Sequence, residues 1–142
     1  LPTAMDLNGV RCTKDFGTSP DALLEGAEAI CEGGVVIEVK CPYRSGSPRA
    51  QQRVYPRQLP QIQGTLMATN RQECHLVSWS PNGCRVFAVQ RDAAYQEMLL
   101  QCLVSFATAA IAGQPLSEGH KEEAAALRSL STQLAQRAQL LG

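Results

Sequence analysis

The chain contains 142 residues, of which 13 are Lys or Arg and 13 are Asp or Glu, so its formal net charge at pH 7 is zero. A balanced charge argues against a generally basic surface that coats nucleic acid, and no apolar run approaches the ~20 residues of a membrane-spanning helix. The length predicts a single domain, residues 1–142. The lack of a long apolar run predicts that the chain has no membrane partner.

The first half of the chain predicts strands around one turn. Residues 22–24 are expected to form a short strand that residues 28–31 extend, and the glycines of 32–34 predict a hairpin turn. Residues 35–41 alternate between two sets of side chains and give the strongest strand prediction. Pro42 ends this strand, because proline cannot donate a ladder hydrogen bond.

The predicted strand carries a pair of charged residues, Glu38 and Lys40, which share one face because they lie two positions apart. Asp21, just before the 22–24 strand, can place a second carboxylate beside that face. Two carboxylates and a lysine at one point can hold a divalent metal ion and position a water, which suits hydrolysis of a phosphodiester. Taken singly, Glu-x-Lys is more typical of an exposed edge strand and Pro-Asp of a turn.

The middle of the chain predicts a helix followed by a β-hairpin. Residues 43–55 read as a loop, and Pro56 suits the first turn of a helix that ends near residue 70. Residues 74–80 and 84–90 predict two strands joined by a Pro-Asn-Gly turn.

Two long helices are predicted at the C-terminal end. Asp92 is the expected N-cap of a helix that runs to residue 112, and Ser117 begins a last helix that runs to residue 141. The expected buried stripes are Tyr95, Met98, Leu99, Cys102, Phe106 and Ala110 on the first, and Leu127, Leu130, Leu134 and Leu141 on the second. The order of elements predicts an α/β fold with a mixed central sheet flanked by helices.

Charge and cysteine content bear on location and partners. No Asp or Glu lies between Cys41 and Gln72, a window that holds Arg44, Arg49, Arg53, Arg57 and Arg71. A local positive band suits a polyanion, although a solvated Arg-rich loop is the alternative. The six cysteines form no Cys-x-x-Cys pair, which indicates buried thiols in a reducing compartment and an intracellular protein, cytoplasmic or nuclear.

The joint pattern resembles the PD-(D/E)xK nuclease superfamily and, within it, the YqaJ-type viral recombinase group, also described as phage lambda exonuclease-like. The resemblance covers residues 17–97 and is carried by Gly17-Thr18-Ser19-Pro20-Asp21, Ile37-Glu38-Val39-Lys40-Cys41-Pro42, Gln61-Ile62-Gln63, Val77-Ser78-Trp79-Ser80-Pro81 and Val89-Gln90-Arg91-Asp92. It implies a restriction-endonuclease-like core, with residues 98–142 forming two appended C-terminal helices. The implied activity is that of a Mg²⁺- or Mn²⁺-dependent exodeoxyribonuclease in DNA recombination or repair.

The resemblance also implies roles for individual residues. Asp21 and Glu38 would bind the metal with the Val39 carbonyl oxygen, Lys40 would polarise the attacking water, and Gln61 would assist it. The implied DNA contacts are Arg44, Arg49, Arg53, Arg57 and Gln58. The expected partner is double-stranded DNA with a free end, and the group's toroidal assemblies imply a homo-oligomer.

One departure keeps other functions open. Many members of the superfamily carry a further acidic residue on an N-terminal helix, whereas residues 1–16 offer only Asp6 and Asp15 and no clear helix. We expect either that this helix lies outside the chain or that the site lacks that carboxylate. The alternatives are a non-catalytic nucleic-acid-binding module on the same fold and a structure-specific endonuclease.

Overall fold

The chain folds around a five-stranded mixed sheet with three helices in the part that the computed structural model describes, residues 5–7, 10–12, 18–25, 33–42 and 48–142. The elements are β1 (Met5–Leu7), β2 (Val10–Cys12), β3 (Ala22–Leu24), β4 (Val35–Lys40), the 3₁₀ turn η2 (Pro56–Gln58), α1 (Leu59–Thr69), β5 (Glu73–Ser80), β6 (Gly83–Gln90), α2 (Ala93–Ile111), α3 (Glu118–Arg137) and β7 (Gln139–Leu140).

The sheet has the strand order β3-β4-β5-β6-β7, and β1 and β2 form a separate antiparallel pair. Only β4 and β5 are parallel; the other neighbours are antiparallel. Parallel neighbours need a long crossover, which η2 and α1 supply between β4 and β5. The α/β fold with two C-terminal helices is therefore confirmed.

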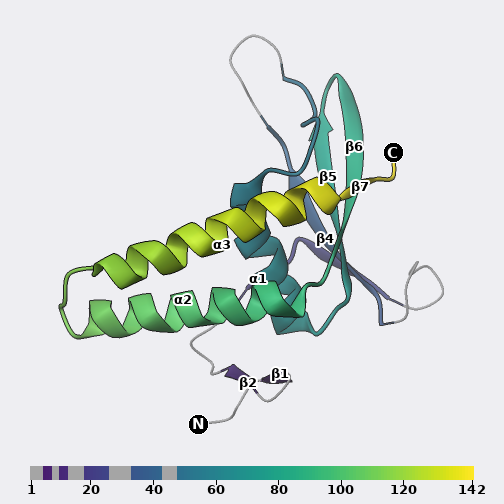
Figure 1. Cartoon of the computed structure of the whole chain (residues 1–142). Helices are drawn as coiled ribbons and strands as arrows, with labels where there is room; N and C mark the ends of the chain where they lie inside the picture. Colours follow the sequence, from purple (N-terminus) through teal and green to yellow (C-terminus); the bar gives the residue numbers. More distant parts are fainter. Residues whose placement is uncertain (1–4, 8–9, 13–17, 26–32, 43–47) are drawn as a thin grey trace.

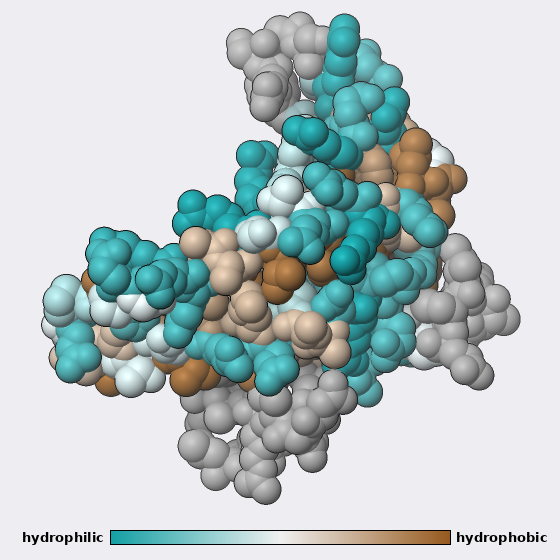
Figure 2. All heavy atoms as spheres, in the orientation of Figure 1, coloured by the Kyte–Doolittle hydropathy of each residue, from teal (hydrophilic) through white to brown (hydrophobic). Residues whose placement is uncertain are grey.

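The helices gather on one side of the sheet, and α2 and α3 lie side by side as a hairpin that extends away from it (Figure 1). The hydrophobic core fills the space between this side of the sheet and the helices. Its buried members are Val36, Val54, Leu59, Ile62, Leu66, Cys74, Leu76, Phe87, Val89, Tyr95, Leu99, Leu134 and Ala135. Hydrophilic residues cover the outer side of the first turns of α3 (Figure 2). No helix of the described residues is long and apolar enough to cross a membrane.

Local signals at the helix ends are confirmed. Asn70 ends α1 in the left-handed conformation, with φ of 54°. The Asp92 side chain accepts a hydrogen bond from the Tyr95 backbone N–H at 2.8 Å and caps α2. The Ser117 side chain accepts one from the His120 backbone N–H and caps α3. Gly34 also meets a steric requirement, because its φ is 82° and a Cβ there would clash with the Leu24 carbonyl oxygen.

Two expectations for the C-terminal helices are wrong. The last helix ends at Arg137, and the chain then turns into β7, where the Leu141 backbone N–H donates to the Val86 carbonyl at 2.8 Å. Pairing with the open edge of β6 replaces the last helical turn, so Leu141 is exposed. On α2, Ala109 is buried and Ala110 is exposed. The predicted strand at residues 28–31 lies outside the described residues.

Candidate functional site

A ring of three polar side chains joins β4 to α1. Gln61 donates from Nε2 to Oε2 of Glu38 at 2.9 Å, and Lys40 donates from Nζ to Oε1 of Gln61 at 2.9 Å. The ring closes through a 3.4 Å ion pair between Lys40 Nζ and Glu38 Oε2. Each of these side chains therefore fixes the position of the other two.

Strand periodicity explains why the glutamate of this ring is buried. Val36, Glu38 and Lys40 alternate onto the face of the sheet that α1 covers, and Val36 belongs to the core. Glu38 is 1% exposed, whereas Lys40 lies further along the strand and reaches solvent. The pair that commonly marks an exposed edge strand here lies under a helix.

Asp21 joins the site through the backbone of β4. Its Oδ2 accepts a hydrogen bond from the Val39 N–H at 2.7 Å, which places the aspartate beside the residue between Glu38 and Lys40. The antiparallel register of β3 and β4, with Ala22 opposite Ile37, brings the start of β3 to this position. The structure thus brings together the four side chains that the sequence proposed as catalytic.

The Glu38 carboxylate is held in an unfavourable electrostatic setting. Burial raises its pKa above the ordinary 4.5, and the negative charge of Asp21 raises it further, while Lys40 opposes both effects. Its second oxygen, Oε1, is buried and accepts no hydrogen bond from the described residues. A buried acceptor without a donor is costly, so this oxygen is available to a cation.

A divalent metal ion fits the residues present. Mg²⁺ and Mn²⁺ prefer oxygen ligands, and the site offers the carboxylates of Asp21 and Glu38, with the Val39 carbonyl on the same strand. The described part of the chain contains no group of three or more His, Cys, Asp or Glu side chains suited to a metal. Of the two acidic residues at positions 1–16 that could add a further carboxylate, Asp6 lies on β1 and Asp15 falls outside the described residues.

A pair of threonines, Thr18 and Thr65, lies next to the site and was not expected from the sequence. Thr65, fully buried on α1, lies 2.7 Å from the Thr18 hydroxyl, oxygen to oxygen, and its hydroxyl acts to lower the pKa of the Glu38 carboxyl. Thr65 follows Gln61 by four residues, a spacing that puts both on one helix face and could have indicated the contact. The pair ties the segment before Asp21 to α1.

The arginines that precede α1 stand on an ordered segment. The Gln51 backbone N–H donates to the Ser78 hydroxyl at 2.9 Å, and Asn82 donates from its side chain to the Pro48 carbonyl at 2.8 Å. Arg53 and Arg57 lie near the Tyr55 ring, with guanidinium carbons 6.0 and 5.0 Å from its centroid. Arg49, Arg53 and Arg57 are all exposed, whereas Arg44 lies outside the described residues.

Gln58, for which a DNA contact is expected, also has a structural role. Its Oε1 accepts from the Tyr55 backbone N–H at 2.8 Å, and its Nε2 donates to Gln51 Oε1 at 3.1 Å. Gln51 returns a hydrogen bond to Gln58 at 3.2 Å, so the two amides close the segment between them. Both the oxygen and the nitrogen of the Gln58 side-chain amide are thus bonded within the chain, and a contact of this residue with DNA stays a prediction.

The chain matches no protein-family model, no curated protein and no solved structure. Any inference about its activity therefore depends on the residues and geometry described above.

The raised pKa of Glu38 predicts a pH-dependent stability. The native state binds the Glu38 proton more tightly than the unfolded chain does, so stability falls as the pH rises above 4.5 through the raised pKa. Glu38→Gln removes the charge, and we expect a Tm at pH 7 about 4 °C above that of the unsubstituted protein, on the order of 1 kcal/mol. At pH 4 the two should melt together. Added Mn²⁺ should raise the Tm of the unsubstituted protein but not that of Glu38→Gln. A Tm of Glu38→Gln at pH 7 below that of the unsubstituted protein would contradict this account.

The threonine pair predicts an effect on metal affinity. Thr65→Val keeps the side-chain shape but removes the hydroxyl that contacts Thr18 and favours the ionised form of Glu38, so we expect roughly 10-fold weaker Mn²⁺ binding by calorimetric titration. Thr65→Ser should restore it. Thr69→Val is the matched control, because the Thr69 hydroxyl bonds only the Thr65 carbonyl of the same helix. Equal affinities in Thr65→Val and Thr69→Val would show that the pair does not support the site.

Proposed function

We propose that this chain is a metal-dependent DNA nuclease of the PD-(D/E)xK type, related to the YqaJ group. The observation that supports this most strongly is the convergence of Asp21, Glu38 and Lys40 with Gln61, at a point where one buried oxygen of Glu38 has no donor among the described residues. On this proposal the mixed sheet and its helices form a restriction-endonuclease-like core.

On this proposal, different side chains of the site would bind the metal ion, orient the water and position the lysine. A divalent ion held by Asp21 and Glu38 would supply Lewis-acid chemistry at the scissile phosphate. Lys40 offers three donors and a positive charge beside that point, which would orient a water and offset the charge that develops on the phosphate. Gln61, bonded to both Glu38 and Lys40, would keep the lysine aimed at the substrate.

DNA binding is assigned to Arg49, Arg53 and Arg57. They lie on one ordered segment that leads directly into α1, which also carries Gln61. Contacts of arginine with phosphates fix the position of a duplex without reading its sequence, as a nuclease of general specificity requires. We further propose that the substrate is duplex DNA with a free end, digested as an exonuclease does in recombination or repair.

A non-catalytic nucleic-acid-binding module is the second candidate. It is favoured by the small number of acidic side chains, since the described residues bring only two carboxylates to the site. Binding of Mn²⁺ separates the two candidates, because a module without a metal site should titrate alike with Asp21 or Asn at position 21. A structure-specific endonuclease would instead cut closed circular DNA, which an exonuclease leaves intact, or cut branched DNA at the branch.

The catalytic assignment predicts a selective loss in Lys40→Ala. We expect release of label from 5′- and 3′-labelled linear duplex in Mg²⁺ or Mn²⁺ to fall at least ~100-fold, since one charge-stabilising group is removed. Mn²⁺ affinity should stay within about threefold, because an ammonium group is not a metal ligand. Lys121→Ala, on the exposed side of α3, should leave hydrolysis unchanged. Full cleavage by Lys40→Ala would remove the role given to this lysine.

The arginine assignment predicts a change in salt dependence. Replacing Arg49, Arg53 and Arg57 by Ala should weaken duplex binding in EDTA and lower the slope of log K against log salt by roughly 0.9 for each lost phosphate contact. A Lys121→Ala, Arg137→Ala variant removes charge from α3 instead and should keep the slope. An unaltered slope in the arginine variant would place the DNA elsewhere.

A further inference from the structure

The α2 helix carries two separate rows of apolar side chains. One side of it packs on α3, where the Tyr95 hydroxyl lies 2.7 Å from the Ser131 hydroxyl. Further along the same side, the centroids of the Phe106 and His120 rings lie 5.4 Å apart. On the opposite side of α2, apolar residues recur at steps of four, three and four positions. We call this second row the α2 seam, and its members are Leu100, Val104, Ala107 and Ile111.

The α2 seam is open to solvent. Val104 is 49% exposed and Ile111 is 89% exposed, and Leu103 beside the seam is 41% exposed. Ala107, between the two β-branched residues, is exposed as well. A surface helix is ordinarily apolar on one side and polar on the other, whereas α2 is apolar on both. A contiguous exposed apolar row of this kind is typical of a surface that another chain covers.

Charge is absent along this part of the chain. The segment from Met98 to Ser117 contains no Asp, Glu, Lys, Arg or His. The positions that flank the seam are therefore uncharged; they are Gln101, Leu103, Thr108 and Ala110. In pairs of helices, charges at such flanking positions select the partner. A seam without them gives a foreign helix no charge to match, and it meets its own copy without like-charge repulsion.

The residue types along the α2 seam favour a pair of helices. Alternating steps of four and three residues give the average spacing of 3.5 at which two helices pack side by side. The β-branched Val104 and Ile111 alternate with Leu100 and Ala107. In coiled coils, this alternation of β-branched residues with leucine favours two strands over three. The small side chain at position 107 allows a close approach of the two backbones.

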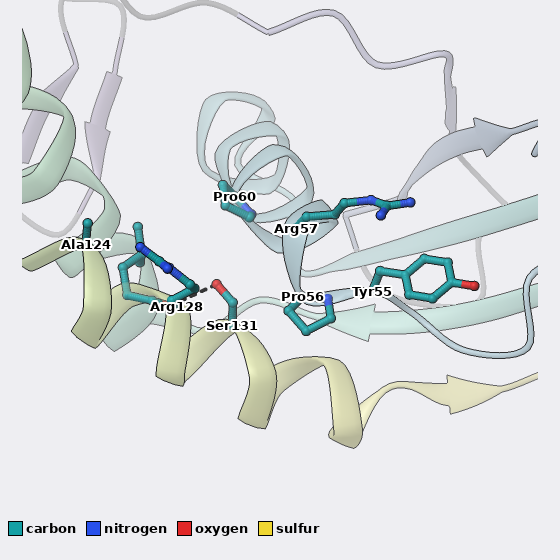
Figure 3. Close-up of a pocket in the computed structure, with 8 residues that line it drawn as sticks. Tyr55, Pro56, Arg57, Pro60, Ala124, Arg128 and Ser131 are labelled. Carbon is teal, nitrogen blue, oxygen red and sulfur yellow. Dashed lines mark hydrogen bonds between the residues drawn. The ribbon is translucent and has the colours of Figure 1, made fainter. Parts of the chain in front are cut away.

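The other helix of the hairpin, α3, is built differently. Ala124 and Leu127 line a cavity of about 410 Å³ between α3 and η2, so this side of the helix faces the chain's own residues (Figure 3). The exposed side of its first turns carries Lys121, Glu122 and Glu123. Charged side chains of this kind remain in solvent, so the apolar surface of the hairpin is on α2.

We propose that two copies of this chain pair about a two-fold axis through the α2 seam, with each seam packed against that of the other copy. The hairpin of α2 and α3 extends away from the sheet, so a second hairpin has room beside it (Figure 1). We expect the seam and its flanks to bury on the order of 500 Å² on each copy, about 1,000 Å² in total, the lower limit for a specific interface. A dimer of this size should dissociate in the micromolar range.

The pair differs from the toroidal assemblies that the nuclease resemblance implies. A ring of three or more copies joins two different surfaces of each copy, whereas a two-fold pair joins one surface to itself. The inference goes beyond the proposed function and does not depend on it, because the ring of Glu38, Lys40 and Gln61 lies between β4 and α1 and takes no part in the seam.

A charge placed in the α2 seam tests the proposal. Sedimentation equilibrium of the unsubstituted protein between about 1 and 200 μM should show monomer and dimer in exchange. Val104→Glu should raise the dissociation constant at least 10-fold, because it brings two like charges together in an apolar interface. The matched control is Ala125→Glu, which adds the same charge at an exposed position of α3 and should leave the dissociation constant unchanged.

Opposite charges at the same position separate a direct contact from damage to the fold. Val104→Lys alone should be as monomeric as Val104→Glu. An equimolar mixture of the two should recover the dimer, because position 104 is near the middle of the seam and approaches its equivalent whether the helices run parallel or antiparallel. A substitution that merely disturbed the fold would not be rescued by mixing.

Several results would overturn the proposal. They are an unsubstituted protein that stays monomeric at every concentration, a trimer, a Val104→Glu variant that dimerises as tightly as the unsubstituted protein, and a mixture that remains monomeric. Because neither DNA nor metal is added, a dimer that fails to cleave labelled DNA contradicts only the nuclease proposal. A monomer that cleaves it contradicts only the pairing through α2.

Discussion

The burial of one carboxylate beneath a helix is the constraint on which the site depends. Glu38 lies on a central strand, where its charge would be strongly unfavourable without the hydrogen bond from Gln61 and the ion pair with Lys40. These contacts satisfy one oxygen and leave Oε1 without a donor from the described residues. On the proposed function, a metal ion bound to Oε1 would supply the partner that this buried oxygen lacks among the described residues.

The position of α1 is what makes that burial possible, and a second glutamine helps to fix it. Gln63 is fully buried, donates to the Gln90 carbonyl at 2.8 Å and accepts from the Asp92 backbone N–H at 3.0 Å. Its amide thus joins α1 to the junction of β6 and α2, with Gln96 adding a further bond at 3.1 Å. Gln61 and Gln63 therefore hold the helix at two points, one at the proposed site and one across the sheet.

Elements with local signals were predicted well. The alternation of residues 35–41, the caps at Asp92 and Ser117 and the turn before β6 each depend on neighbours in sequence, and each appears within about a residue of its expected place. The end of α3 was not predictable in this way. Residues after Arg137 have no strong local preference, and the open edge of β6 decides their extended conformation.

The sequence by itself determined the strand that carries Glu38 and Lys40 and the order of the elements. It also supplied the residue types, carboxylates and a lysine, that can hold a divalent metal ion and position a water. Periodicity encodes these features directly. Only the tertiary structure decided which face of that strand is buried. It also decided that Asp21 accepts a hydrogen bond from the β4 backbone and that the Gln58 amide donates to Gln51. Such contacts join residues far apart in the chain or depend on the path of a loop, and no local preference specifies them.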